Sequence, residues 1–207
     1  MPHHPHSRAS TAARSHIIEL LQDDHRRLKR AYREFQRLDA DRDGSLCESI
    51  VRRTLQEMRV HAQLEDELIY PLMRPIVSDP ERVDEAEVEH EVMTLLIAQL
   101  EHANAADDKF SARFAVLCEY LLHHIKEEEG ELFPQLKRAT LDWESVCDEF
   151  TGRREALLAA EARDPLSTMP DAPPTDETGL LLSSHRPAHH PARYPAHESG
   201  SITSRKI

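Results

Sequence analysis

Apolar residues recur every three or four positions along four stretches of this chain, which is the spacing of helices with one buried face. These stretches cover residues 15–38, 47–73, 81–103 and 109–138. Glycine is rare between residues 15 and 160, and the two-residue alternation typical of strands is absent. The pattern therefore predicts an all-helical core of four long helices, and a shorter amphipathic stretch at 141–161 predicts an accessory helix.

Six ionisable residues fall on or beside these apolar faces: His25, His61, Glu65, His90, His124 and Glu128. A histidine and a glutamate four residues apart on a helix lie one turn apart and point the same way, so both can reach one ion. A single pair of this kind is more often a solvated pair that stabilises its helix. The spacing alone is therefore weak evidence for a metal site.

The stronger signal is that the His-x-x-x-Glu pattern occurs twice with the same residues after it. The first copy is followed by Tyr70-Pro71 and the second by Phe133-Pro134, with each proline six residues after its glutamate. A lone histidine precedes the first copy by 36 residues and the second by 34 residues. These matches indicate an internal duplication of a helix hairpin.

Two such hairpins packed face to face would bring four histidines and two glutamates into one layer of an apolar core. Metal coordination would remove the cost of burying those carboxylates. Imidazole and carboxylate together favour iron, manganese or zinc over calcium or magnesium, and helix bundles are a common place for dinuclear sites. The sequence thus predicts a pair of metal ions in the core.

With this ligand order the chain resembles the hemerythrin-like domains of the HHE cation-binding type over roughly residues 15–139. The resemblance implies an antiparallel up-down four-helix bundle with two iron ions in a non-haem di-iron centre, with manganese or zinc as the lesser alternatives. It implies that Glu65 and Glu128 bridge the irons. By the same resemblance, one iron takes two histidines from the first hairpin and the other takes two from the second: His25 with His61, and His90 with His124.

One departure bears on function. Oxygen-carrying hemerythrins have two histidines four residues apart on the third helix, whereas Ala86 and Thr94 stand at that spacing from His90. The missing ligand favours interaction with oxygen, peroxide or nitric oxide in redox stress response, sensing or iron handling over oxygen carriage. Two alternatives stay open, namely an enzyme that decomposes peroxide or repairs iron centres, and a metal-dependent interaction protein.

Several other sequence features resemble ligand or donor sites. His123 and Glu127 form a rival pair off the apolar stripe, and Glu127, Glu129 and Glu131 read as a solvated acidic face. Glu87 precedes His90 by three residues, as in ferritin-like proteins, but that architecture needs the element twice. Tyr32 is a candidate hydrogen-bond donor near the site. Residues 39–46 resemble the start of a calcium loop, yet Ile50 replaces its twelfth-position glutamate, which favours a polar turn.

Composition and charge predict the partners, the location and the tails of the protein. The formal net charge of -12 argues against nucleic-acid and anionic-membrane partners, and no stretch resembles a signal peptide or a membrane span. Three scattered cysteines without a Cys-x-x-Cys pattern fit a reducing compartment, so we expect a cytoplasmic protein. Residues 1–14 and the Pro/His/Ser-rich residues 162–207 are predicted to be disordered tails around a metal-binding bundle at 15–140. A protein partner is not predicted.

Overall fold

The computed structural model describes residues 8–163, apart from the side chain of Asp41. Residues 1–7 and 164–207, which make up half of the predicted N-terminal tail and most of the predicted tail at 162–207, lie outside this range. Within it the chain is entirely helical, as predicted. Each helix in the described range is too short or too polar to cross a lipid bilayer.

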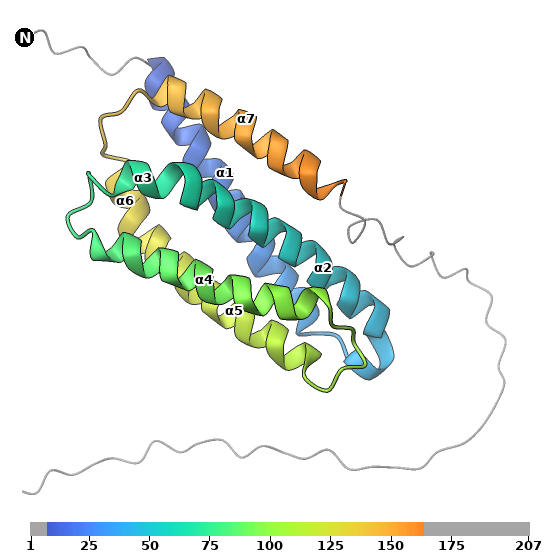
Figure 1. The fold of residues 1–207 in the computed structure, drawn as a ribbon. Coiled ribbons are helices and arrows are strands. Elements are labelled where there is room, and N and C mark those ends of the chain that lie inside the picture. The colour runs from blue at the N-terminus through green and yellow to red at the C-terminus, as the bar shows by residue number, and fades with distance from the viewer. Residues whose placement is uncertain (1–7, 164–207) are drawn as a thin grey trace, which may run out of the picture. The chain divides into compact units, whose positions relative to one another are not determined.

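Four long helices form the body of the molecule (Figure 1): α1 (Arg8–Phe35), α2 (Ala40–Leu64), α4 (Glu81–Glu101) and α5 (Phe110–Glu127). α2 returns alongside α1 and α5 returns alongside α4, while α2 also packs on α4 and α1 on α5. A fifth long helix, α7 (Trp143–Glu161), packs along α1 and α2. The four body helices therefore surround one shared core.

The first residues of α1 and of α2 both differ from the prediction. α1 begins at Arg8, so residues 8–14 are helical rather than disordered, because alanines at 9, 12 and 13 favour helix and Ala13 packs against the core. α2 begins at Ala40 and is kinked at Asp43, whose carboxylate accepts a hydrogen bond from the Asp39 backbone N–H. The predicted polar turn is therefore mostly helix, which leaves no room for an extended calcium-binding loop.

α2 and α5 each end in one turn of π-helix, which the apolar pattern did not predict. These turns are η1 (Glu65–Ile69) and η2 (Glu128–Leu132), followed by α3 (Tyr70–Met73) and α6 (Phe133–Leu136). The backbone N–H of Tyr70 bonds to the carbonyl of Glu65, and that of Phe133 to Glu128, five residues back. The next residue is proline in each case, which cannot donate a helical hydrogen bond, and the wider turn accommodates it.

The core has an apolar cluster on each side of a polar layer. One cluster includes Leu28, Phe35 and Phe114, and the other includes Ile17, Leu64 and Trp143. Buried between them are the six residues singled out in the sequence. Trp143, Phe150 and Leu157 bring α7 into the second cluster, so this helix completes the core.

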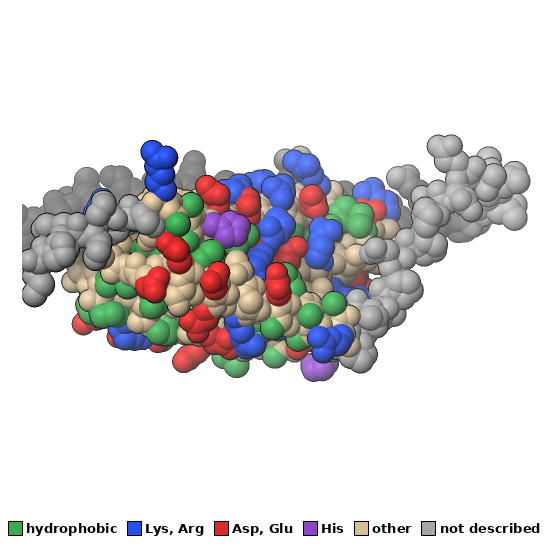
Figure 2. Space-filling view, turned by 90° about the horizontal axis from the view of Figure 1, so that it is seen from above, with side chains coloured by type: hydrophobic (Ala, Val, Ile, Leu, Met, Phe, Trp, Pro, Cys, Tyr) green, Lys and Arg blue, Asp and Glu red, His purple; other side chains and the backbone are tan. Residues whose placement is uncertain are grey.

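Ion pairs hold α7 in place from its polar side. Arg154 binds Asp24 of α1, Arg153 binds Glu67 and Glu161 binds Arg59. On the face shown in Figure 2, acidic and basic side chains are interspersed and neither sign forms a large patch.

Candidate metal centre

The structure brings all six predicted site residues into one buried layer. His25 lies on α1, His61 at the end of α2, His90 on α4 and His124 on α5, while Glu65 and Glu128 begin the two π-helical turns. None of the six is more than 3% exposed. The wider turn after each glutamate follows directly from the aromatic-proline signature, so one local feature shapes both copies of the site.

The four histidines form two pairs that face each other through their Nε2 atoms. Nε2 of His25 lies 3.0 Å from Nε2 of His61, and Nε2 of His90 lies 3.1 Å from Nε2 of His124. Two nitrogens that each lie about 2.1 Å from one ion, at right angles, are about 3.0 Å apart. Each pair therefore has the spacing of two neighbouring ligands on one metal ion.

Each glutamate reaches toward both histidine pairs. Oε2 of Glu128 lies 3.3 Å from Nε2 of His25 and also 3.3 Å from Nε2 of His124. Oε2 of Glu65 lies 3.1 Å from Nε2 of His61 and 3.7 Å from Nε2 of His90. Carboxylates placed between two groups of nitrogens are suited to bridge two ions.

Three of the four oxygens of the buried carboxylates lack a hydrogen-bond partner, and this is the test of whether a metal fits. Both oxygens of Glu65 and Oε2 of Glu128 are buried without a hydrogen bond. Burial raises the pKa of Glu65 well above its usual range, and the charge of Glu128 adds to this effect. Burial also opposes ionisation of Glu128, but His124 and His25 outweigh it and hold its pKa well below the usual range. A bound cation would satisfy these oxygens, so the residues fit a metal.

Each histidine also faces a carboxylate on its outer side. The Nδ1 atoms of His25, His90 and His124 lie within hydrogen-bond distance of a carboxylate oxygen, and Nδ1 of His61 lies 3.6 Å from one. The partners are Glu129 at 2.9 Å, Asp66 at 2.7 Å, Glu89 at 2.9 Å and, for His61, Asp24. A carboxylate beside Nδ1 keeps the proton there and leaves the Nε2 lone pair free for the centre.

Sequence reasoning missed these four acids, and its view of Glu129 as part of a solvated face was wrong. Glu129 is one-third exposed and accepts from His25. A signal was present, because the duplication extends to them. Asp24 and Glu89 each precede the lone histidine of their copy, and an acid also follows each glutamate of the pattern, Asp66 in the first copy and Glu129 in the second.

The tyrosine hydroxyl beside the centre belongs to Tyr70 and not to Tyr32, the predicted donor. Tyr32 packs edge-on against Phe114 in the apolar cluster, so it belongs to the core. Tyr70 was noted in the sequence only as the aromatic before a proline, yet its hydroxyl donates to Oε1 of Glu128 over 2.9 Å. That hydroxyl also lies 3.4 Å from Nε2 of His90.

His123 and Glu87, the alternative candidates in the sequence, lie outside the centre. His123 is 58% exposed and faces Glu89 and Glu127 at the surface. The carboxylate of Glu87 accepts from Arg74 on the outer side of α4. Neither reaches the facing Nε2 atoms.

Comparison with known proteins agrees with this geometry. A DNA nickase from Nostoc sp. (strain PCC 7120 / SAG 25.82 / UTEX 2576) is 22% identical over 121 residues, which are 58% of this chain and 33% of that protein. The chain thus spans about a third of the length of this relative, and no solved structure gives a significant match. The model of the hemerythrin HHE cation binding domain matches residues 16–136, which include all six centre residues. The chain therefore belongs to the hemerythrin HHE cation-binding family.

Proposed function

We propose that this protein holds two iron ions in its core as a non-haem di-iron centre that interacts with oxygen, peroxide or nitric oxide. The observation that carries the proposal is the pair of facing Nε2 groups with partnerless glutamate oxygens between them. In this proposal His25 and His61 hold one ion, His90 and His124 hold the other, and the two glutamates bridge them. The surrounding helices form the antiparallel up-down bundle typical of the family.

The donor set supports iron over the alternatives. Each half offers two imidazoles and a share of two carboxylates, and two histidines with one carboxylate are the usual ligands of non-haem iron with open positions. Manganese and zinc accept similar donors and are the lesser alternatives. When bound, iron supplies redox chemistry and a Lewis-acidic position for a small molecule.

The protein's own residues hold and tune the centre. The outer carboxylates fix the imidazoles of His25, His90 and His124 with the proton on Nδ1, which orients Nε2 inward and raises its strength as a ligand. Apolar clusters flank the layer on both sides. An oxygen carrier has one more histidine on its third helix, whereas this chain has Ala86 and Thr94 at the corresponding spacing from His90. The missing ligand favours redox sensing, stress response or iron handling over carriage.

We extend to this chain neither the activity of the nickase relative nor a nucleic-acid partner. DNA binding depends on cationic side chains that neutralise phosphates, and this chain carries a formal net charge of -12. A cytoplasmic location and the absence of a membrane partner are part of the same proposal.

The hydroxyl of Tyr70 favours a second candidate, an enzyme that decomposes peroxide or repairs iron centres. This group is a buried proton donor 2.9 Å from Glu128 and 3.4 Å from Nε2 of His90. A proton donor at that place would suit a reaction that protonates an oxygen atom of a small substrate.

The deciding experiment is to purify the protein, count its metal, reduce it without oxygen and record spectra after separate additions of oxygen, peroxide and nitric oxide. Two irons per chain and a spectral change with one of these ligands support the proposal. A metal-free protein or a single zinc ion contradicts it. A stable and reversible oxygen adduct would instead assign a carrier.

Variants test the site itself. His61→Ala and Glu128→Ala are each expected to lose metal, because each removes a ligand from the buried layer. His123→Ala is the matched control, since His123 lies on the surface beside the same helix turn, and it is expected to retain both ions. Loss of metal in the control alone would show that the centre lies elsewhere.

A further inference from the structure

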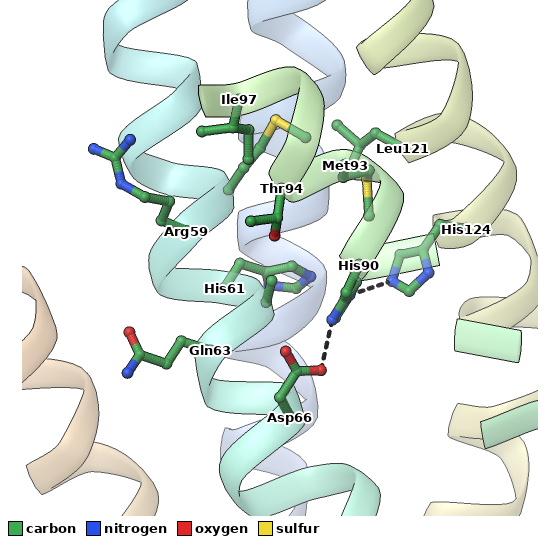
Figure 3. Close-up of a pocket in the computed structure, with 12 residues that line it drawn as sticks. Arg59, His61, Gln63, Asp66, His90, Met93, Thr94, Ile97, Leu121 and His124 are labelled. Carbon is green, nitrogen blue, oxygen red and sulfur yellow. Dashed lines mark hydrogen bonds and ion pairs between the residues drawn. The ribbon is translucent and has the colours of Figure 1, made fainter. Parts of the chain in front are cut away.

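A cavity of about 220 Å³ lies between α2 and α4 and leads to the centre (Figure 3). Three of the four centre histidines line it, namely His61, His90 and His124. Asp66 and Thr94 also line it, and both border a surface hollow of about 420 Å³ that includes Glu91. The cavity therefore lies beside three of the centre histidines and adjoins the surface hollow at Asp66, His90 and Thr94.

The chemistry of the cavity selects for a small uncharged molecule. Its inner wall is formed by buried apolar side chains, Met58, Met93, Ile97 and Leu121. Its outer rim carries Asp66, and the hollow beyond adds Glu87 and Glu91. Arg59 also lines the cavity, but its guanidinium is paired with Glu101 and Glu161. Apolar walls favour an apolar ligand, and acidic side chains at the entrance disfavour anions.

The duplication explains why this side is open. Three residues that border the cavity correspond to larger ones in the other half, and the corresponding pairs are Ala62 with Ile125, Thr94 with Lys29, and Ile97 with Tyr32. On that other side Nζ of Lys29 lies 3.2 Å from the Glu129 carboxylate that holds His25. Smaller residues where α2 faces α4 thus leave space, and their larger counterparts lie where α5 faces α1.

We infer that this cavity is the entry path and binding place of an uncharged diatomic gas, which reaches the centre past Thr94 on the side of His90. The inference rests on the proposed function, because it needs an ion at the centre for the gas to meet. It narrows that function, since peroxide in this path would contact the oxidisable thioethers of Met58 and Met93. Thr94, at the spacing of the absent carrier histidine, is the gate residue.

The test uses nitric oxide and the full-length, metal-loaded, reduced protein in a stopped-flow instrument. Thr94→Trp places a bulky ring at the mouth, and its displacement before entry should slow association about tenfold. Leu95→Trp is the matched control, because Leu95 is the next residue and is 66% exposed, and it should associate at the wild-type rate. Ala62→Leu narrows the path from α2 and should also slow association.

Two further measurements distinguish a failure of the proposed metal centre from a failure of the entry path. These are the metal content and xenon binding to the metal-free protein. A wild-type protein without metal contradicts the proposed function, while xenon still tests the cavity. Dissolved xenon should shift the Ile97 methyl signals of the wild-type metal-free chain but not those of Thr94→Trp. Full metal content with an unchanged nitric oxide rate in Thr94→Trp and Ala62→Leu would overturn the inference.

A comparison of azide with nitric oxide tests whether the path disfavours anions. Azide is an anion, so it should associate more slowly than nitric oxide and should accelerate as salt screens the acidic rim. Azide association that is fast at low salt and slows with added salt would overturn the assignment to an uncharged ligand.

Discussion

The hydroxyl of Tyr70 donates a hydrogen bond to Oε1 of Glu128 over 2.9 Å, and this bond joins the first copy of the hairpin to the second. The corresponding residue in the second copy, Phe133, has no hydroxyl. Its ring instead stacks on His25, with the planes 4° apart and the centroids 5.6 Å apart. The two halves of the centre thus share their inner ligands but differ in the aromatic residue beside them.

Tyr70→Phe should destabilise the metal-free protein. The change removes the hydrogen bond to a carboxylate whose other oxygen already lacks a partner, at an expected cost of about 1–3 kcal/mol. Urea unfolding measures the loss. Tyr32→Phe makes the same chemical change in the apolar cluster and should cost less. Equal losses in the two variants would show that the Tyr70 hydroxyl contributes nothing particular to the centre.

Glu129→Gln should weaken metal binding by about tenfold to a hundredfold. Its carboxylate fixes the proton of His25 on Nδ1, and the neutral amide does so less strongly. Competition with a chelator of known affinity measures the change. Glu127→Gln removes the same charge two residues away, where the carboxylate pairs with the surface His123, and should leave affinity unchanged. Similar losses in both variants would indicate a general charge effect instead.

Arg154→Ala should destabilise the protein far more than Arg153→Ala. Each arginine binds a carboxylate through two hydrogen bonds, but Asp24 is buried whereas Glu67 is more than one-third exposed. Arg154→Ala removes one of the two arginines that bond the buried Asp24, and Arg27 remains, so the expected cost is about 1.5–3 kcal/mol. A surface pair contributes about 1 kcal/mol or less. Thermal unfolding of the two variants decides. A larger loss in Arg153→Ala would contradict the role given to Asp24.

The Arg154 effect should depend on pH. Burial opposes ionisation of Asp24, but His61 and Arg154 outweigh it, so its pKa lies below the ordinary value of 3.8. A carboxyl with a lowered pKa stabilises the folded state above that ordinary value and loses this contribution as the pH falls below it. The stability difference between wild type and Arg154→Ala should therefore be full at pH 6 and shrink below about pH 4. A difference that grows with acid would contradict this explanation.

Metal binding to the metal-free protein should release protons at neutral pH. Burial opposes charge on His124, but Glu128 and Glu89 outweigh it and raise the pKa of His124 to about 10. The pKa of Glu65 is also raised, by burial and by Glu128. Both groups must lose a proton to bind an ion, so apparent affinity should rise with pH. Calorimetry in buffers of different ionisation enthalpy counts the protons, and Glu65→Gln should release one fewer.

The sequence by itself determined the helical class and the layer of six ionisable residues. The three-to-four spacing of apolar positions reports which face of each helix is buried, and His25 and Glu128 fall on such faces. The duplicated aromatic-proline signature then selected His124 over His123, and the structure places only His124 in the layer. This information is local, because it depends on neighbours within two turns of one helix.

Only the tertiary structure decided which side chains meet across helices. Asp66 reaches His90 and Glu129 reaches His25 from different hairpins, and those contacts depend on how each helix is rotated and how closely it packs. The same holds for the Tyr70 hydroxyl, whose partner lies 58 residues away. The cavity beside Thr94 arises because small residues on α2 and α4 face each other, a coincidence between helices that no spacing along one helix encodes.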